Sequence, residues 1–112
     1  MGKTSKPSEL LPGTLDLLIL QTLMTGEMHG YGIAQRIRQV SDDVLQVGES
    51  SLYPALQRLL VNGWVGSEWR ASENNRRARY YTLTASGKKQ LRREREEIER
   101  VIGAIEKILQ LA

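Results

Sequence analysis

Residues 48–64, GESSLYPALQRLLVNGW, have the apolar spacing of an amphipathic helix. Four leucines recur at intervals of three or four residues and therefore share one face: Leu52, Leu56, Leu59 and Leu60. The opposite face gathers polar side chains and one tyrosine: Ser50, Ser51, Tyr53, Gln57 and Arg58. We expect the helix to end at Asn62 and Gly63, because these residues tolerate the left-handed backbone that closes a helix. The segment predicts a helix with one buried face and one face available for contacts.

Pro54 limits where this helix can begin. The first four N–H groups of a helix have no acceptor within it, so proline costs little there, whereas deeper in the helix it costs about 3 kcal/mol. A cap at Ser50 or Ser51 would place Pro54 at the end of the first turn. A helix that begins at Gly48 or Glu49 would instead have a distorted or kinked first turn. In both cases the free N–H groups and serine hydroxyls at the helix start suit a phosphate. The alternative is that Pro54 only limits the helix and contacts no ligand.

Two further helices are expected before this segment. Thr14 can cap the first, which runs to about Met24 and is apolar on two sides. One stripe can face the core of the domain: Leu15, Leu18, Ile19 and Leu23. The other stripe needs a different neighbour, for which we expect a second subunit: Leu17, Leu20 and Met24.

The second helix follows a glycine-rich turn in GEMHGYGIAQRIRQVSDD, residues 26–43. Its inward positions are Ile33, Ile37 and Val40. His29, the only histidine, stands at the start of this helix in a chain without cysteine. We therefore expect His29 to be a residue of the helix start and not a metal ligand or a catalytic base.

A hairpin follows the leucine helix. Residues 64–71 (WVGSEWRA) and 77–84 (RARYYTLT) alternate as strands do, and residues 72–76 (SENNR) have turn chemistry. Tyr81 shares the face of Leu83 and is expected to point inward, while Trp64 and Trp69 are interpreted as hairpin and core residues. Three arginines stand at the tip and on the second strand, with Arg70 expected across from them: Arg76, Arg77 and Arg79. They favour phosphate contact, and the alternative is that they keep an edge strand soluble.

Thr84 is the natural N-cap of a last helix of about 28 residues, roughly 42 Å long. Its apolar positions beyond residue 91 follow a heptad: Ile98, Val101, Ile102, Ile105, Ile108 and Leu109. A helix of this length is too long for the small domain before it to cover. We expect it to be half exposed unless another chain covers it.

Three helices and a hairpin in this order predict a mainly α fold with a small antiparallel β-hairpin, a winged helix-turn-helix. We expect residues 1–83 to form the DNA-binding domain, with a flexible arm at 1–9, and residues 84–112 to form a dimerisation helix. In this architecture the third helix enters the major groove and the hairpin reaches the neighbouring minor groove or backbone. The expected DNA contacts are the exposed residues of the third helix, including its first turn with Pro54, and the three hairpin arginines.

Charge and composition agree with a nucleic-acid partner. The chain has 112 residues and a net charge of +3, with the positive excess in residues 48–90, which hold seven basic and three acidic groups. The sequence shows no nucleophile paired with a base, no pair of catalytic carboxylates and no set of metal ligands, so we expect neither an enzyme nor a cofactor. No apolar run is long enough to cross a bilayer, so we expect a cytoplasmic protein without a membrane partner.

Four motifs occur in order: HGYGIAQRI (29–37), SSLYPALQRL (50–59), NGWV (62–65) and RYYTLTASG (79–87). Together they resemble the PadR family of bacterial transcriptional regulators, over about residues 11–90. The single last helix resembles that of compact members, which dimerise through it. The resemblance implies a homodimer that binds a palindromic operator, usually as a repressor released by a small molecule. It implies DNA contacts from three elements: Tyr31, Gln35, Ser50, Ser51, Tyr53, Arg58, Arg76 and Arg77.

Two points remain open at the level of sequence. Some members of that family bind flat aromatic effectors through an aromatic residue of the last helix, and residues 84–112 contain none. The alternative function is a helical dimerisation or adaptor module whose basic hairpin docks an acidic protein. The two functions differ in whether the chain prefers particular duplex sequences over random DNA.

Overall fold

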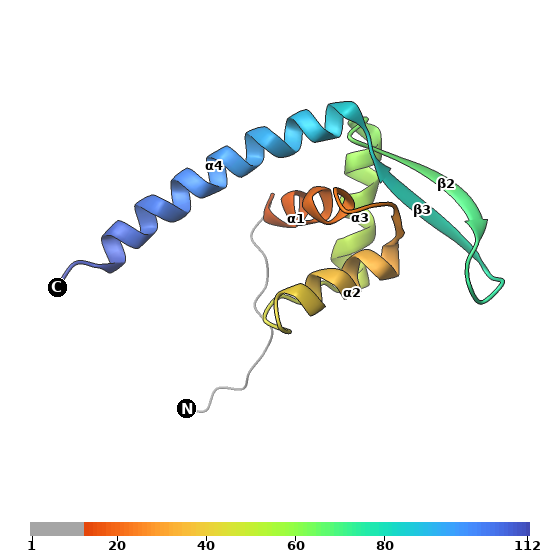
Figure 1. The fold of residues 1–112 in the computed structure, drawn as a ribbon, viewed down its shortest axis with the longest axis horizontal. Coiled ribbons are helices and arrows are strands. Elements are labelled where there is room, and N and C mark those ends of the chain that lie inside the picture. Colours follow the sequence, from red (N-terminus) through yellow and green to blue (C-terminus); the bar gives the residue numbers. More distant parts are fainter. Residues whose placement is uncertain (1–12) are drawn as a thin grey trace.

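The computed structural model describes residues 13–112, and the predicted arm at 1–9 lies outside this range. The described chain contains these elements (Figure 1): α1 (Thr14–Leu23), β1 (Met28–His29), α2 (Gly30–Val40), α3 (Glu49–Val61), β2 (Val65–Ala71), β3 (Arg77–Leu83) and α4 (Ala85–Leu109). This order confirms the predicted fold class, which is mainly α with a small antiparallel sheet. The first three helices gather at the base of the hairpin, whereas α4 runs away from it (Figure 1).

β2 and β3 form the predicted hairpin, called the wing below. Their antiparallel ladder begins and ends with these pairs: Val65 with Leu83, and Ala71 with Arg77. At the tip, the Ser72 N–H donates to the Arg76 carbonyl oxygen over 2.6 Å, and Asn75 adopts a φ of 62°. Asparagine is one of the few residues other than glycine that accepts this conformation readily.

The sheet has a third strand that the sequence does not reveal. β1 pairs with β3, so the strand order is β1-β3-β2, with Met28 opposite Tyr81 and His29 opposite Tyr80. Two residues are too few to show the alternation that marks a strand. β1 matters for the site because it ties the start of α2 to the wing.

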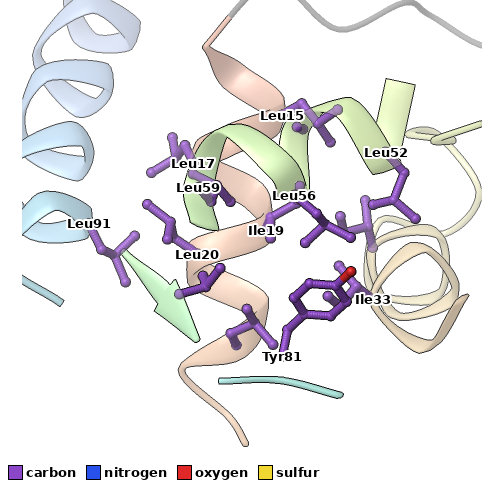
Figure 2. Close-up of a cluster of buried hydrophobic side chains, with 14 residues drawn as sticks. Leu15, Leu17, Ile19, Leu20, Ile33, Leu52, Leu56, Leu59, Tyr81 and Leu91 are labelled. Carbon is purple, nitrogen blue, oxygen red and sulfur yellow. The ribbon is translucent and has the colours of Figure 1, made fainter. Parts of the chain in front are cut away.

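The hydrophobic core is formed by α1, α2, α3 and the base of the sheet. Figure 2 shows leucine and isoleucine side chains of the three helices converging around α1, with Tyr81 of β3 and Leu91 of α4 closing the cluster. The predicted inward positions Ile33, Ile37 and Tyr81 are buried. Val40 is an exception: it is exposed at the last residue of α2, where the helix has left the core.

α1 is buried on both apolar stripes within one chain. Leu17 is 9% exposed and Leu20 is 0% exposed, because α1 packs against α2, α3, β3 and α4 together. Figure 2 shows Leu17 and Leu20 on the side of α1 that Leu91 of α4 approaches. The prediction that these two leucines need a second subunit is therefore wrong. Met24, the last residue of that stripe, remains half exposed.

The caps of the helices explain where they begin. α1 starts at Thr14, but its N-cap is Gly13 with a φ of 88°, so the predicted Thr14 cap is off by one residue. His29 is the N-cap of α2, and its Nδ1 accepts the Gly32 N–H over 3.0 Å, which confirms its role at the helix entry. Thr84 caps α4 as predicted, accepting the Gly87 N–H over 2.9 Å.

α3 begins earlier than a serine cap would allow. Its N-cap is Gly48, so neither Ser50 nor Ser51 is the cap, and Pro54 is an interior residue of the helix. Pro54 has no N–H for the Ser50 carbonyl, its helical acceptor. Because both residues lie on the exposed face, water can satisfy that carbonyl, which lowers the cost of the proline.

The far end of α3 follows the prediction. Gly63 has a φ of 76°, and its N–H donates to the Leu60 carbonyl. The Trp64 N–H donates to the Leu59 carbonyl, which completes a Schellman motif. The chain thus reverses directly from α3 into the wing.

α4 is anchored at its start and exposed along the rest. The Thr84 hydroxyl donates to the Gly63 carbonyl over 2.7 Å, and Gly87 lies against the Trp64 carbonyl, where a Cβ would overlap it. Within the helix only Gly87 and Leu91 are buried. The 25-residue helix, slightly shorter than predicted, is therefore exposed over much of its length, as expected.

Candidate nucleic-acid interface

The exposed face of α3 holds the residues that the sequence placed there. Their side chains are exposed at the surface: Ser50, Ser51, Tyr53, Pro54 and Gln57. The leucine face of the same helix is buried at Leu52, Leu56 and Leu59. The buried leucines therefore hold α3 in the core, and its short polar side chains point toward solvent.

Tyr53 has both a packing contact and an exposed surface. Its ring covers Gly30, where a Cβ would lie 2.9 Å from Tyr53 Cε1. Glycine at position 30 thus allows α3 to approach the start of α2 closely. The ring is nevertheless exposed enough to offer an edge and its hydroxyl to a ligand.

Tyr31 and Gln35 extend this surface along α2. Tyr31 is exposed and stacks on the His29 ring, with centroids 6.4 Å apart. Gln35 is exposed one turn later. A cavity of about 540 Å³ between α2 and α3 is lined by both residues and by Tyr53, so the two helices share one continuous contact surface.

Arg77 and Arg79 both lie near the Trp69 ring on the wing. The Arg77 guanidinium is 5.3 Å from the Trp69 centroid, and that of Arg79 is 5.9 Å away. The Arg79 Nε also donates to the Ser67 hydroxyl over 2.9 Å, which fixes this arginine in a half-buried position. Arg76 and Arg77 are exposed. Within residues 13–112, no ion pair engages any of the three arginines.

Arg58 forms an ion pair with α1, whereas the sequence predicted that its side chain would be free for DNA. One guanidinium nitrogen lies 2.8 Å from a carboxylate oxygen of Asp16. The two residues are far apart in sequence and meet because α1 crosses α3. The prediction missed this pair because a helical wheel gives the face of a residue but not its neighbour on another helix.

Arg70 lies on the opposite face of the wing from the other arginines. It pairs across the ladder with Ala78, so its side chain leaves the sheet on the side opposite to Arg77 and Arg79. There its guanidinium lies 2.7 Å from Glu27 and 4.3 Å from the Tyr80 ring centroid. Arg70 thus lies on the strand across from the other arginines, as expected, but strand alternation points its side chain to the opposite face.

Two pKa shifts reflect these surroundings. The hydrogen bond from Arg70 lowers the pKa of Glu27, so this carboxylate remains charged beside the guanidinium. Burial raises the pKa of the Tyr81 hydroxyl, although the nearby Arg79 acts in the opposite direction. Tyr81 is therefore a neutral core residue at physiological pH.

A cleft separates the wing from the helices. Its volume is about 890 Å³, and it is open on one side. The helical wall includes Tyr31, Gln35 and Tyr53, and the wing wall includes the following residues: Trp69, Arg76, Arg77 and Arg79. The cleft thus collects the predicted contact residues of α2 and the wing, but Tyr53 is the only residue of α3 that lines it. The other predicted contacts of α3 lie outside the cleft: Ser50, Ser51, Pro54, Gln57 and Arg58. The described residues contain no cluster of metal-ligating side chains. Residues 13–112 also form no helix long and apolar enough to span a membrane.

Three packed helices followed by a wing, with the leucine face of the third helix buried and its polar face exposed, define a winged helix-turn-helix of DNA-binding proteins. The sequence profile of the PadR-like family of transcriptional regulators matches residues 19–93, and the chain belongs to this family. Its members regulate transcription by binding DNA and are not enzymes.

Solved structures agree with this assignment. A transcriptional regulator from Clostridium thermocellum is 34% identical, with a TM-score of 0.80 over 88% of this chain and 95% of that one. A PadR family regulator from Clostridium difficile is 28% identical, with a TM-score of 0.75 over 87% and 99% of the two chains. A protein of Lysinibacillus sphaericus is 28% identical over 98 residues, covering 85% of this chain and 90% of that protein.

Proposed function

We propose that this protein is a sequence-specific repressor that binds a palindromic operator as a homodimer. The observation that carries the proposal is the pairing of two features in one small chain. One is a polar helix face beside an arginine-bearing wing, and the other is a long helix with an uncovered apolar stripe. The first supplies a half-site reader, and the second supplies a means of joining two readers.

The apolar stripe of α4 supports the homodimer. Exposure of its side chains rises from 37% at Val101 to 77% at Leu109. The remaining members of the stripe are Ile98, Ile102, Ile105 and Ile108. A monomer rarely leaves so continuous an apolar strip in water. A second copy of the same helix matches it in length and heptad pattern, and Met24 of α1 lies at its edge.

DNA contacts are assigned to two elements with different tasks. Ser50, Ser51 and Gln57 on α3 enter the major groove, where short hydroxyl and amide groups can read base edges. Tyr31, Gln35 and Tyr53 flank them. Arg76 and Arg77 on the wing contact phosphates, which positions the protein without reading sequence. Arg58 and Arg79 act mainly by holding α3 and the wing in place, because each already has a partner within the chain.

The proposal includes release by a small molecule in the cytoplasm. A cavity of about 330 Å³ lies between Met24 and the first half of α4, beside the proposed dimer interface. A ligand there would change how α4 leaves the body and so the distance between the two α3 helices. Because α4 has no aromatic side chain, an effector would be held by aliphatic and charged groups.

Selection of bound sequences from random duplexes tests this function. We expect an inverted repeat whose half-sites are about 34 Å apart, or a multiple of that distance. Arg77→Ala should weaken binding to every sequence and lower the salt slope by about 1, whereas Gln57→Ala should change base preference. Retention of random duplexes as strongly as any selected one, at moderate salt, would contradict the proposal.

A further inference from the structure

We propose that Trp69 contacts DNA directly: its indole packs against the deoxyribose of a strand that lies in the cleft between the wing and α2. In that position it also orients Arg77 toward an adjacent phosphate. This inference rests on the proposed function, since it requires the wing to meet duplex DNA.

The first argument is that Trp69 is exposed on the face of the wing that is buried near its base. Val65, Trp69 and Tyr81 leave the sheet on the same side, as the ladder pairing requires. Tyr81 is only 4% exposed, whereas Trp69 is 55% exposed. The reason is geometric, because the wing extends beyond the helical body and its inner face there borders the cleft. The largest aromatic side chain of the wing thus stands at a place where the fold does not cover it.

The second argument comes from charge on the two faces of the wing. On the outer face, Arg70 lies over Tyr80, and Glu27 neutralises the arginine at 2.7 Å. On the inner face, Arg77 lies over Trp69, and no carboxylate among residues 13–112 pairs with it. The same kind of cation–π pair therefore occurs on both faces. The arginine of the outer pair already has a carboxylate partner, whereas the arginine of the inner pair can still bind an anion. The inner pair lacks an anion that the outer pair has.

The third argument is the shape and lining of the cleft. One wall offers the Trp69 ring with Arg76 and Arg77, and the other offers Tyr31 and Tyr53. A sugar-phosphate strand alternates an anion with an apolar deoxyribose ring. An arginine beside an exposed indole matches that alternation, because the guanidinium can hold a phosphate while the ring covers the sugar.

Cation–π contact gives Trp69 a second effect, which is to position Arg77. A free arginine loses rotamer entropy when it binds a phosphate, and contact with the indole restricts the side chain in advance. Arg79 gains the same restriction from its hydrogen bond to Ser67. Trp69 is therefore both a contact residue and a positioning residue for the wing.

Substitutions at position 69 test the inference through affinity. Trp69→Ala should weaken binding to operator and to random duplex alike by about five- to tenfold, because a sugar contact does not read sequence. The double variant Trp69→Ala/Arg77→Ala should lose less affinity than the product of the losses in the two single variants, because the two side chains act together. Trp69→Phe, which keeps a ring, should lie between Trp69→Ala and the wild type. Thr82→Ala, an exposed change on the outer face of the wing, is the matched control and should bind as the wild type does.

A spectroscopic measurement separates contact from a loss of folding. In protein labelled with 5-fluorotryptophan, the two ¹⁹F signals are assigned with Trp69→Phe, since Trp64 is the only other tryptophan. Addition of duplex should shift the Trp69 signal and leave that of Trp64 nearly unchanged. Circular dichroism should show that Trp69→Ala is folded, because the side chain is exposed.

The outcomes distinguish the two proposals. A wild-type protein that binds no duplex DNA at low salt would end the proposed function and the inference with it. A wild type that binds DNA while the Trp69 signal stays in place, or a folded Trp69→Ala variant of unchanged affinity, would overturn only the inference.

Discussion

The winged-helix body and α4 use the same aliphatic side chains in opposite ways. In the body, residues on every side of α1 are covered by a neighbouring element of the same chain. In α4, Leu91 is buried and Ile98 still packs against the core, whereas Ile102, Ile105 and Ile108 are exposed. Apolar patterning therefore stabilises one region by itself and leaves the other dependent on a partner. What separates them is the number of elements within reach, because in the described part of the chain no apolar side chain of α4 beyond Ile98 packs against the body.

The largest expected effect is the loss of the dimer through α4. Ile105→Asp places a charge in the centre of the exposed stripe, where burial against a second copy would be costly. We expect a monomer in sedimentation experiments and operator binding weaker by at least about 100-fold, since the two half-sites no longer bind together. Glu106→Ala in the same turn is the control and should remain dimeric. A monomeric Ile105→Asp protein with full operator affinity would refute the proposed role of α4.

The next effect concerns folding of the body. Leu59→Ala removes a fully buried side chain of α3 and should lower the free energy of unfolding by about 2–5 kcal/mol. The same truncation at Leu109, near the exposed end of α4, should cost less than about 0.5 kcal/mol when both are measured in the monomeric Ile105→Asp background. Urea denaturation provides both values. Equal losses would show that the body and α4 do not differ as described.

Two glycines of α4 should respond with opposite signs. Gly87→Ala forces a Cβ onto the Trp64 carbonyl at the junction with the body, which should cost about 1–3 kcal/mol and change the angle of α4. Gly103 has open space around it and lies on the other side of the helix from the stripe, so Gly103→Ala should stabilise the chain by about 1 kcal/mol. Thermal unfolding of the two variants checks this. A tolerated Gly87→Ala would mean that the junction does not fix α4.

The smallest effect concerns the link between the wing and β1. Arg70 lowers the pKa of Glu27, so the folded chain retains the carboxylate at a pH where the unfolded chain protonates it. The stabilisation is present above the ordinary pKa of glutamate and disappears as pH falls through the lowered value. Glu27→Gln should therefore be slightly less stable than the wild type at neutral pH, and the difference should shrink as pH falls below the ordinary pKa of glutamate, about 4.3. A difference between the two proteins that persists unchanged in acid would exclude this ion pair as its source.

Much of the fold was predictable because its signals are local. The leucine spacing of α3, the glycine that ends it and the Thr84 cap of α4 each depend on neighbours within a few residues. The sequence left two starts open for α3, a serine cap or a start at Gly48 or Glu49, and the structure has the second. The choice was not predictable because Gly48 has no side chain to act as a cap. β1 was missed because its pairing partner lies about fifty residues away in β3.

The candidate site was predictable as a set of exposed residues but not as an arrangement. Arg58 was expected to be free for DNA, and the structure pairs it with Asp16 of α1. The partner of Arg70, Glu27, also comes from a distant segment that the sequence pattern does not indicate. Trp69 looked like a core residue, and the structure places it at the edge of a cleft. Periodicity assigns a side chain to a face of its own element, but what covers that face depends on how elements dock.

The sequence by itself determined the order of the elements, the leucine face of α3 and the unusual length of the apolar stripe on α4. Those features follow from spacing and local backbone preference, which act within one or two turns. Only the tertiary structure decided that α1 is buried on both apolar stripes. It also decided that Arg70 has a carboxylate partner, Glu27, whereas Arg77 pairs with no carboxylate among residues 13–112. The physical reason is that burial and ion pairing are set by neighbours brought together from distant parts of the chain, and a pattern along the chain does not contain those neighbours.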